Sequence, residues 1–271
     1  MIYSKSWYDH KKHVRITFSI LRAHHLVVKR EKCQFGETKV KYLGHIICND
    51  GVKVDPDKIK EMEGWPKLSI VKALRGFLEL TGYYRKFIAG YGNIAAPLTS
   101  MLKKNSFFFF LNSEADMAFE LLKQSMTHAP VLALPNFTFL FIVECDASGS
   151  GLCVVLMQEQ KPISYFSTAL KGKNLLLSTY EKELMALVLA VKKRRSYLLG
   201  CHFVVRTDQR SLKYLWEQRI MTEPQQKWLL KLMGYDFSIK YNKGKSNAAA
   251  YALSRRDVQG EINSISCLLP Q

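Results

Sequence analysis

The sequence lacks a long apolar run, paired zinc-ligand cysteines and an internal repeat. A membrane-spanning helix needs about 20 consecutive apolar residues, whereas the longest apolar run, LMALVLAV, covers only residues 184–191. The first residues contain no apolar stretch of the kind found in a signal peptide. The six cysteines form no CxxC pair and have no histidine partners at zinc-finger spacing. We therefore expect no membrane contact, free thiols, and an intracellular protein of the cytoplasm or nucleus.

Positive charge is the main compositional bias of the chain. The sequence has 40 Lys and Arg residues against 23 Asp and Glu residues, a formal net charge of +17. A field of this sign attracts polyanions, mainly by releasing counterions from phosphates. The same charge is compatible with an ordinary basic protein, so the motifs must decide whether a nucleic acid is the partner. The hydrophobic content of 48% is ordinary for a chain that buries a core.

The first half of the sequence combines helices with short strands. Residues 8–25 carry apolar residues near helical spacing. Residues 33–54 are rich in Val, Tyr and Ile and predict a strand pair. Asp55 and Pro56 have the residue types of a helix N-cap and a first helical position. Residues 70–90 predict a basic helical stretch with aromatic side chains, which completes an α+β N-terminal part.

The second half predicts an α/β fold. We expect strands at 138–145, 151–158, 162–167, 202–206 and 236–241, and helices at 178–198, 209–217, 223–233 and 247–255. This βββ-α-β-α-α-β-α order implies a mixed sheet of five strands covered by helices.

Three carboxylates stand where strands and helices of the second half begin or end. Two-metal hydrolysis of a phosphodiester requires several carboxylates from separate, rigid elements. Asp146 closes an apolar strand, Glu183 lies on the long helix, and Asp208 follows a strand and opens a helix. Each has an ordinary alternative: a turn residue, a solvated helix charge and an N-cap, respectively. The residues alone leave both interpretations open.

Four segments, taken together, favour the metal-ligand interpretation of these carboxylates. They are VECDASGSG (143–151), STYEKELMALV (178–188), VRTDQRSLKYL (205–215) and GKSNAAAYALSRR (244–256). In combination they resemble the ribonuclease H (RNase H) domain of a Ty3/gypsy-type long-terminal-repeat retrotransposon Pol polyprotein. The resemblance implies an RNase H-like fold and Mg²⁺-dependent (or Mn²⁺-dependent) cleavage of RNA in an RNA–DNA hybrid. It implies that Asp146, Glu183 and Asp208 are the metal ligands and catalytic residues.

The family's fourth carboxylate position is occupied here by Tyr251. A phenol has a reference pKa of about 10, so it is neutral near pH 7 and a poor ligand for Mg²⁺. We therefore expect severely impaired hydrolysis. The alternative that follows is a non-enzymatic, nucleic-acid-binding remnant of a retroelement. Two further positions depart from the family pattern: Cys153 replaces a small residue, and Arg194 stands where tryptophan is common.

The first half resembles the reverse transcriptase of the same family. The matching segments are HLVVKREKCQFGETKVKYLGHII (25–47), VDPDKIKEMEGWP (54–66) and ALRGFLELTGYYRKFIAGYGNIAAPLTSMLKK (73–104). The sequence contains no Tyr-X-Asp-Asp polymerase motif, so we expect no DNA polymerisation by this chain alone.

The resemblance implies a division into domains. Residues 1–111 would form the end of the palm with the thumb and connection, and 112–135 a linker helix and loop. Residues 136–256 would form the RNase H-like domain, followed by a loose tail at 257–271.

The expected partner is an RNA–DNA hybrid or another nucleic-acid duplex. Other Pol segments or a second subunit are further candidate partners. The residues that could contact the nucleic acid are Tyr84, Arg85, Lys86, Arg206, Lys243 and Lys245. For the aromatic and basic residues near 84–86, a core helix with solvated lysines is an equally good interpretation.

Overall fold

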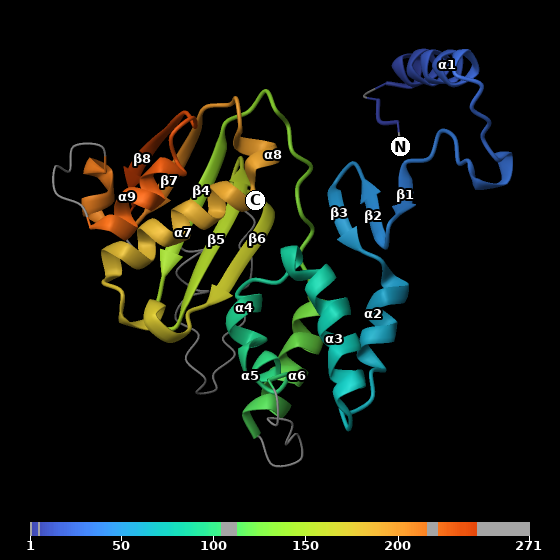
Figure 1. Ribbon diagram of the computed structural model, residues 1–271. Coiled ribbons are helices and arrows are strands. Elements are labelled where there is room, and N and C mark those ends of the chain that lie inside the picture. Colours follow the sequence, from blue (N-terminus) through green and yellow to red (C-terminus); the bar gives the residue numbers. More distant parts are fainter. Residues whose placement is uncertain (1, 5, 104–112, 216–221, 243–271) are drawn as a thin grey trace, which may run out of the picture.

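The computed structural model describes residues 2–4, 6–103, 113–215 and 222–242. Its elements pack around two hydrophobic cores, one in each half of the chain. Figure 1 shows the N-terminal elements beside a larger sheet with helices, and the two groups meet at α4 and β6.

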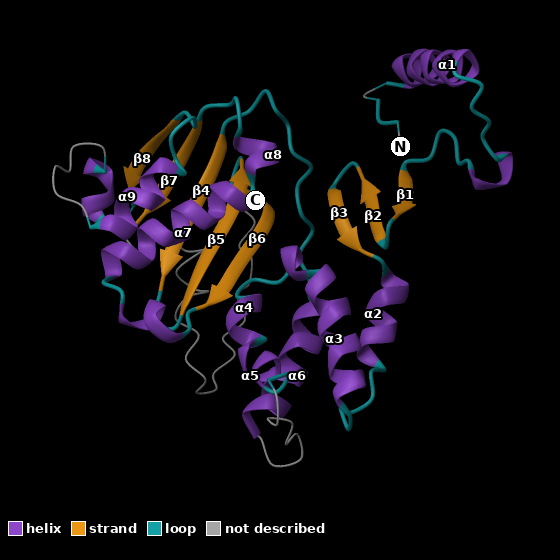
Figure 2. Cartoon of the chain, in the orientation of Figure 1, coloured by secondary structure: helices purple, strands orange, loops and turns teal. Residues whose placement is uncertain are grey.

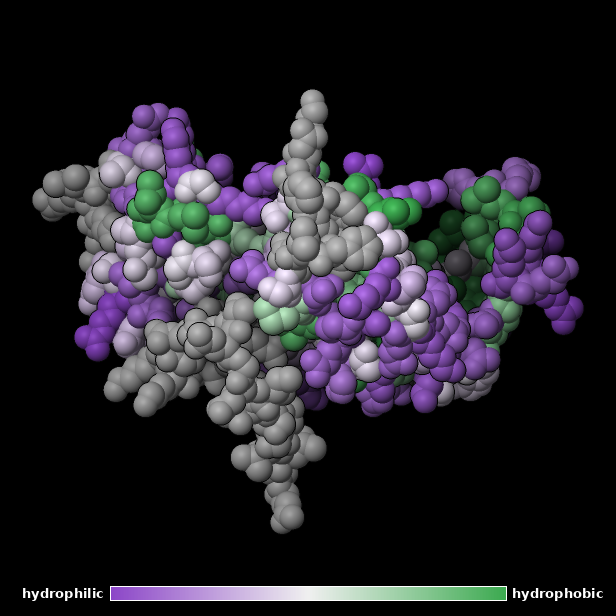
Figure 3. Space-filling view, turned by 90° about the horizontal axis from the view of Figure 1, so that it is seen from below, coloured by the Kyte–Doolittle hydropathy of each residue, from purple (hydrophilic) through white to green (hydrophobic). Residues whose placement is uncertain are grey.

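The N-terminal half begins with helix α1 (Trp7–Ala23), which buries none of its residues. A short 3-10 helix, η1 (Arg30–Lys32), follows it. Large hydrophobic side chains are exposed on and after α1, and green, hydrophobic atoms gather at the same end of the space-filling view (Figure 3). The predicted first helix is therefore present, but it contributes nothing to either core.

Residues 33–54 form three strands instead of the predicted pair. The antiparallel strands are β1 (Lys39–Tyr42), β2 (His45–Cys48) and β3 (Gly51–Val54), in that order across the sheet. The additional turn lies at Leu43 and Gly44, which both have positive φ angles. A two-residue turn of this kind suits glycine but not leucine, so the sequence signal for it was weak.

The remaining N-terminal helices enclose the first core. They are α2 (Pro56–Glu63), α3 (Val71–Tyr83), η2 (Arg85–Phe87), α4 (Tyr91–Ile94), α5 (Ala96–Ser100) and α6 (Ser113–Thr127). Helix α2 starts as the sequence predicts, because the Asp55 side chain accepts a hydrogen bond from the backbone N–H of Asp57 at 3.1 Å.

Helix α6 is part of the N-terminal core and not merely a linker. The residues that it buries recur at helical spacing: Ala115, Ala118, Phe119, Leu122 and Met126. The Phe119 ring lies 4.6 Å from that of Phe77 on α3, measured between centroids. The expectation of a linker helix at 112–135 overlooked this apolar face. The remaining domain boundaries stay a prediction.

The C-terminal half contains the predicted five-stranded mixed sheet. Its strands are β4 (Phe141–Ala147), β5 (Gly151–Gln158), β6 (Lys161–Ala169), β7 (Phe203–Thr207) and β8 (Phe237–Tyr241). The order across the sheet is β6-β5-β4-β7-β8 (Figure 2). Pairs β4–β5 and β5–β6 are antiparallel, whereas β4–β7 and β7–β8 are parallel. This confirms the α/β class and the mixed sheet.

Helix α7 (Thr179–Lys193) packs along one face of the sheet (Figure 1). A capping box between Ser178 and Glu181 fixes its first turn. The predicted single helix 178–198 is interrupted at Arg194, after which α8 (Arg195–Leu198) follows.

The other short helices are η4 (Gly172–Leu176), η5 (Arg210–Tyr214) and α9 (Glu223–Leu230). The predicted helix at 209–217 is thus a 3-10 helix in its described part. The expected helix at 247–255 and the tail lie outside the described residues.

The two cores are joined along the edge strand β6. The backbone N–H of Gly92 donates to Ser167 Oγ at 2.8 Å, and a Cβ atom at Gly92 would lie 2.6 Å from the Cα of Thr168. Within the C-terminal half, Arg194 Nη2 donates to the backbone oxygen of Tyr165, which lies on β6, at 2.9 Å. Arg194 is half-buried at the position where the resemblance leads one to expect tryptophan, and this bond satisfies its charged group.

The described cysteines are free thiols, as expected: Cys33, Cys48, Cys145, Cys153 and Cys201. Cys267 lies outside the described residues. In the described part of the chain, no helix combines the length and apolar character needed to cross a membrane.

Candidate metal centre

Asp146 lies near the carboxyl end of the central strand β4 and is 5% exposed. Strand β4 pairs with β5 on one side and β7 on the other, so its backbone is held from both sides. In the antiparallel register Asp146 faces Cys153. The strand positions this carboxylate rigidly at the edge where β4 and β7 both end.

Glu183 projects from α7 and is completely buried. Its Oε1 accepts a hydrogen bond from the backbone N–H of Ala147 at 2.7 Å. Its Oε2 accepts one from the hydroxyl of Thr207 at 3.2 Å. These two bonds connect the helix to the ends of β4 and β7, which fixes the direction of the carboxylate. The sequence alternative of a solvated helix charge is therefore wrong.

Asp208 follows β7 and is partly exposed. The helix after it begins at Arg210 and has Gln209 as its N-cap, so Asp208 does not have the N-cap role that was the sequence alternative. The Gln209 backbone N–H donates to Thr207 Oγ1 at 3.1 Å. This bond shapes the turn that carries Asp208 toward the other two carboxylates.

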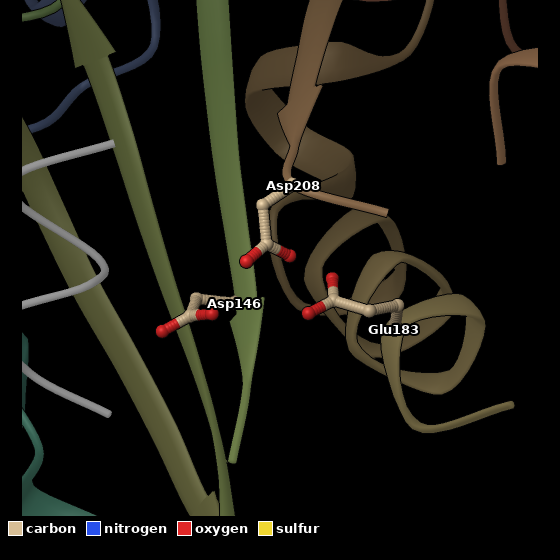
Figure 4. Close-up of side chains that lie close together, drawn as sticks. All are labelled: Asp146, Glu183 and Asp208. Carbon is tan, nitrogen blue, oxygen red and sulfur yellow. The ribbon is translucent and has the colours of Figure 1, made fainter. Parts of the chain in front are cut away.

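The three carboxylates converge in space (Figure 4). One oxygen from each of Asp146, Glu183 and Asp208 lies within 4.8 Å of the others, and among the described residues this group could hold a metal ion. We call these residues the carboxylate triad. Its oxygens come from β4, α7 and the segment after β7. Hard carboxylate oxygens suit Mg²⁺ or Mn²⁺, so the donor set fits the expected ion.

Burial and the neighbouring carboxylates both act on the pKa of Glu183. Burial and the neighbouring charge of Asp146, with a smaller contribution from Asp208, raise the pKa of Glu183 to about 8. The hydrogen bonds from Ala147 and Thr207 act in the opposite direction. A divalent cation at this position would favour the ionised carboxylates, because it supplies the missing positive charge.

The three candidate nucleic-acid contacts near η2 differ in how far they are exposed. Tyr84 is 1% exposed, and its hydroxyl donates to the backbone oxygen of Gly44 at 2.8 Å, so its assignment as a stacking residue is wrong. Arg85 is exposed and stays a prediction, with its guanidinium 5.7 Å from the Phe166 ring centroid. Lys86 is half-buried, and burial together with the charge of Arg194 lowers its pKa.

The remaining candidate positions stay predictions. The Arg206 guanidinium donates to Glu144 Oε1 at 3.1 Å, and its side chain is 25% exposed. Lys243, Lys245 and Tyr251 lie outside the described residues.

Sequence reasoning did not single out Thr207 or Glu144. Thr207 holds Glu183, and Glu144 holds Arg206. Strand alternation carried some signal, because Glu144 shares a face with Asp146 in an otherwise apolar strand. The partner of each could only come from the tertiary structure.

Comparison with known proteins agrees with this geometry. The family described as an RNase H-like domain found in reverse transcriptase matches residues 136–235. The Pol polyprotein of the Drosophila melanogaster transposon 297 is 39% identical over 264 residues, which cover 97% of this chain and 25% of that protein. The corresponding protein of transposon gypsy, from the same organism, is 32% identical over 275 residues, covering 97% and 27%. The chain thus spans about a quarter of the length of these relatives.

Solved structures show the same fold. The foamy viral protease-reverse transcriptase in complex with an RNA/DNA hybrid has a TM-score of 0.75 at 20% identity, covering 100% of this chain and 37% of that chain. Its dRH form in complex with double-stranded DNA has a TM-score of 0.78 at 21% identity, covering 89% and 44%.

Proposed function

Since this chain is homologous over most of its length to Pol polyproteins of gypsy-type transposons and carries an RNase H-like domain of the reverse transcriptase kind, we propose that it binds RNA–DNA hybrids. We further propose that the carboxylate triad is the metal site for hydrolysis of the RNA strand. The observation that carries the proposal is the convergence of Asp146, Glu183 and Asp208 to within 4.8 Å.

Each triad residue has a distinct task in this proposal. Two divalent ions in such a site would activate the attacking water and stabilise the leaving oxygen. Asp146 and Asp208 would supply charge from the ends of adjacent strands. Glu183 would supply a carboxylate whose direction is set by Ala147 and Thr207. Recognition of a hybrid would depend on 2′-hydroxyl groups across a wide minor groove, and the net charge of +17 would favour its approach.

Tyr251 limits the proposed activity. At the fourth carboxylate position of the family, a neutral phenol removes one ligand and one negative charge. We therefore expect hydrolysis to be severely impaired while the fold and the other three ligands remain. DNA synthesis is not proposed for this chain alone, since its sequence has no Tyr-X-Asp-Asp motif; another Pol segment or a second subunit would have to supply it.

A non-enzymatic nucleic-acid binder is the second candidate. Tyr251 and the high positive charge favour it. This function predicts salt-sensitive binding of duplexes without turnover, because phosphate contacts release counterions. A failure to bind a hybrid at low salt would eliminate this candidate.

The decisive experiment follows cleavage of a labelled RNA–DNA hybrid in Mg²⁺ or Mn²⁺. We expect Tyr251→Asp to cleave at least about tenfold faster than the wild type, because loss of even an outer-shell partner of a metal ligand costs about 10–100-fold. Tyr251→Phe is the matched control and should stay as slow as the wild type. Asp146→Asn, placed in the Tyr251→Asp background, should abolish the gain.

Two outcomes would contradict the proposal. Wild-type cleavage that is unaffected by Asp146→Asn would exclude the triad as the site. Full wild-type cleavage that does depend on Asp146 would show that three carboxylates suffice and that Tyr251 is harmless.

A further inference from the structure

A partly buried ion pair joins strands β4 and β7 near their carboxyl ends, close in sequence to Asp146 and Asp208. Arg206 of β7 donates from Nη1 to Glu144 Oε1 of β4 at 3.1 Å. The side chains are 25% and 4% exposed, respectively. The parallel register places the two residues directly opposite each other. Because Glu144 is almost closed off from water, the guanidinium supplies much of the stabilisation that its charge needs.

Each member of this pair lies two residues before one of the triad residues. Glu144 precedes Asp146 by two positions, so both side chains point to the same face of the sheet, roughly 7 Å apart along the strand. Arg206 likewise precedes Asp208 by two positions. An arginine side chain is long enough to cover that distance. The guanidinium is held by Glu144, and its side chain is long enough to reach toward Asp146 or Asp208 if that bond is lost.

The carboxylate triad would also attract this guanidinium. A guanidinium stays charged in proteins and matches the geometry of carboxylates. Attraction between charges also grows as water is excluded. If Glu144 did not hold it, the guanidinium of Arg206 would turn to Asp146 or Asp208. It would then occupy carboxylate oxygens that a divalent cation requires.

We infer that Glu144 is a positioning residue that holds the Arg206 guanidinium away from the carboxylate triad, and so keeps Asp146 and Asp208 available to a divalent cation. This inference rests on the proposed function, because it takes the triad to be a metal site. The competing explanation is an ion pair that only fixes the register of β4 and β7. That explanation predicts equal losses from removal of either partner.

Calorimetric titration of the full chain with Mn²⁺ separates the two explanations. Glu144→Gln should raise the Kd for Mn²⁺ at least about tenfold, which corresponds to about 1.4 kcal/mol. The stoichiometry should not change, because excess Mn²⁺ displaces a competing side chain. Arg206→Met should bind Mn²⁺ at least as tightly as the wild type. The double variant should return to within about threefold of the wild type, as a coupled pair requires.

Three results would overturn the inference. The first is a Glu144→Gln variant that binds Mn²⁺ as tightly as the wild type. The second is a double variant as weak as Glu144→Gln. The third is a loss in Arg206→Met equal to that in Glu144→Gln, which would establish the structural explanation. Thermal unfolding in EDTA identifies variants that lose the fold. If Glu144→Gln does not fold, Glu144→Asp keeps the charge, loosens the pair, and should show a smaller rise in Kd that Arg206→Met reverses.

The titration also distinguishes this inference from the proposed function. Asp146→Asn is the control that removes a triad ligand, and Tyr251→Asp is measured beside the wild type. If neither the wild type nor Tyr251→Asp shows Mn²⁺ binding that depends on Asp146, the proposed metal site fails and the inference fails with it. If binding depends on Asp146 but not on Glu144, the inference alone fails.

Discussion

Glu183 combines complete burial with an acidic group, which is costly without a nearby cation. In the metal-free protein, burial and the charge of Asp146 raise the pKa of Glu183 to about 8. The unfolded chain has no such environment, so the group there ionises near its ordinary value of 4.5. Between these two values the folded state binds more protons than the unfolded state. Stability from this group is therefore lost as the pH rises.

We predict that the metal-free protein becomes less stable as the pH rises from about 5 to about 8. Glu183→Gln should remove this part of the pH dependence, since an amide does not titrate. Thermal unfolding in EDTA at several pH values measures the effect. An identical pH slope in wild type and Glu183→Gln would show that Glu183 is not the group responsible.

Thr207 supplies one of the two hydrogen bonds that direct Glu183. Thr207→Val keeps the shape of the side chain but removes the hydroxyl, so we expect a loss of about 1 kcal/mol in unfolding free energy. Thr207→Ser keeps the donor and should lose less. Chemical denaturation of the three proteins tests this. Equal stability of the valine variant and the wild type would mean that this bond contributes nothing.

Individual residues show where sequence reasoning works and where it stops. The triad was predicted correctly as a set of neighbours, because its motifs are long and each follows a strand or lies on a helix. Adjacent tyrosines at 83 and 84 could not be told apart: Tyr83 is exposed, whereas Tyr84 belongs to the core. Likewise, nothing local in the sequence identifies Glu144 as the partner of Arg206, since 62 residues separate them.

At the scale of elements, strong local signals were reliable. Strand β5 has the predicted bounds, 151–158, because a continuous apolar run is flanked by a glycine and a charged turn. Helix α2 begins at the predicted proline because its cap is local. The third N-terminal strand and the buried face of α6 were missed. Both depend on contacts with distant residues, which local propensity does not encode.

The close contact between α4 and β6 requires a residue without a Cβ atom at position 92, which is Gly92. A Cβ at Gly92 would lie 2.6 Å from the Cα of Thr168 and 2.7 Å from its backbone nitrogen. Because backbone atoms cannot move aside cheaply, we predict that Gly92→Ala costs about 1–3 kcal/mol of stability. Gly149→Ala is the matched control, since no atom lies within 4 Å of its new Cβ. Urea unfolding that ranks both variants equally would contradict the close approach.

At the scale of the whole molecule, two cores share one chain, and the elements around them meet at β6 in the described residues. The resemblance to reverse transcriptase and RNase H motifs was enough to predict the class of both halves. It could not predict how they meet, because Gly92 and Ser167 lie 75 residues apart in the sequence. The division at about residue 135 stays a prediction, although α6 packs with the N-terminal core before it.

The position of β6 at the edge of the sheet predicts how a fragment without the N-terminal half would behave. Strand β6 is the last strand on its side of the sheet, and α4 and η2 pack against it. A fragment that starts at residue 136 retains the sheet but loses that cover. Exposed strand edges pair readily with other copies, so we predict that such a fragment self-associates while the full chain does not.

Sedimentation velocity at several concentrations compares the two proteins. A fragment that stays monomeric at every concentration would show that α4 and η2 are dispensable as cover. If the fragment associates, the reverse transcriptase-like half has a further role besides any contact with nucleic acid. It covers the edge strand β6 and so prevents the sheet from pairing with other copies.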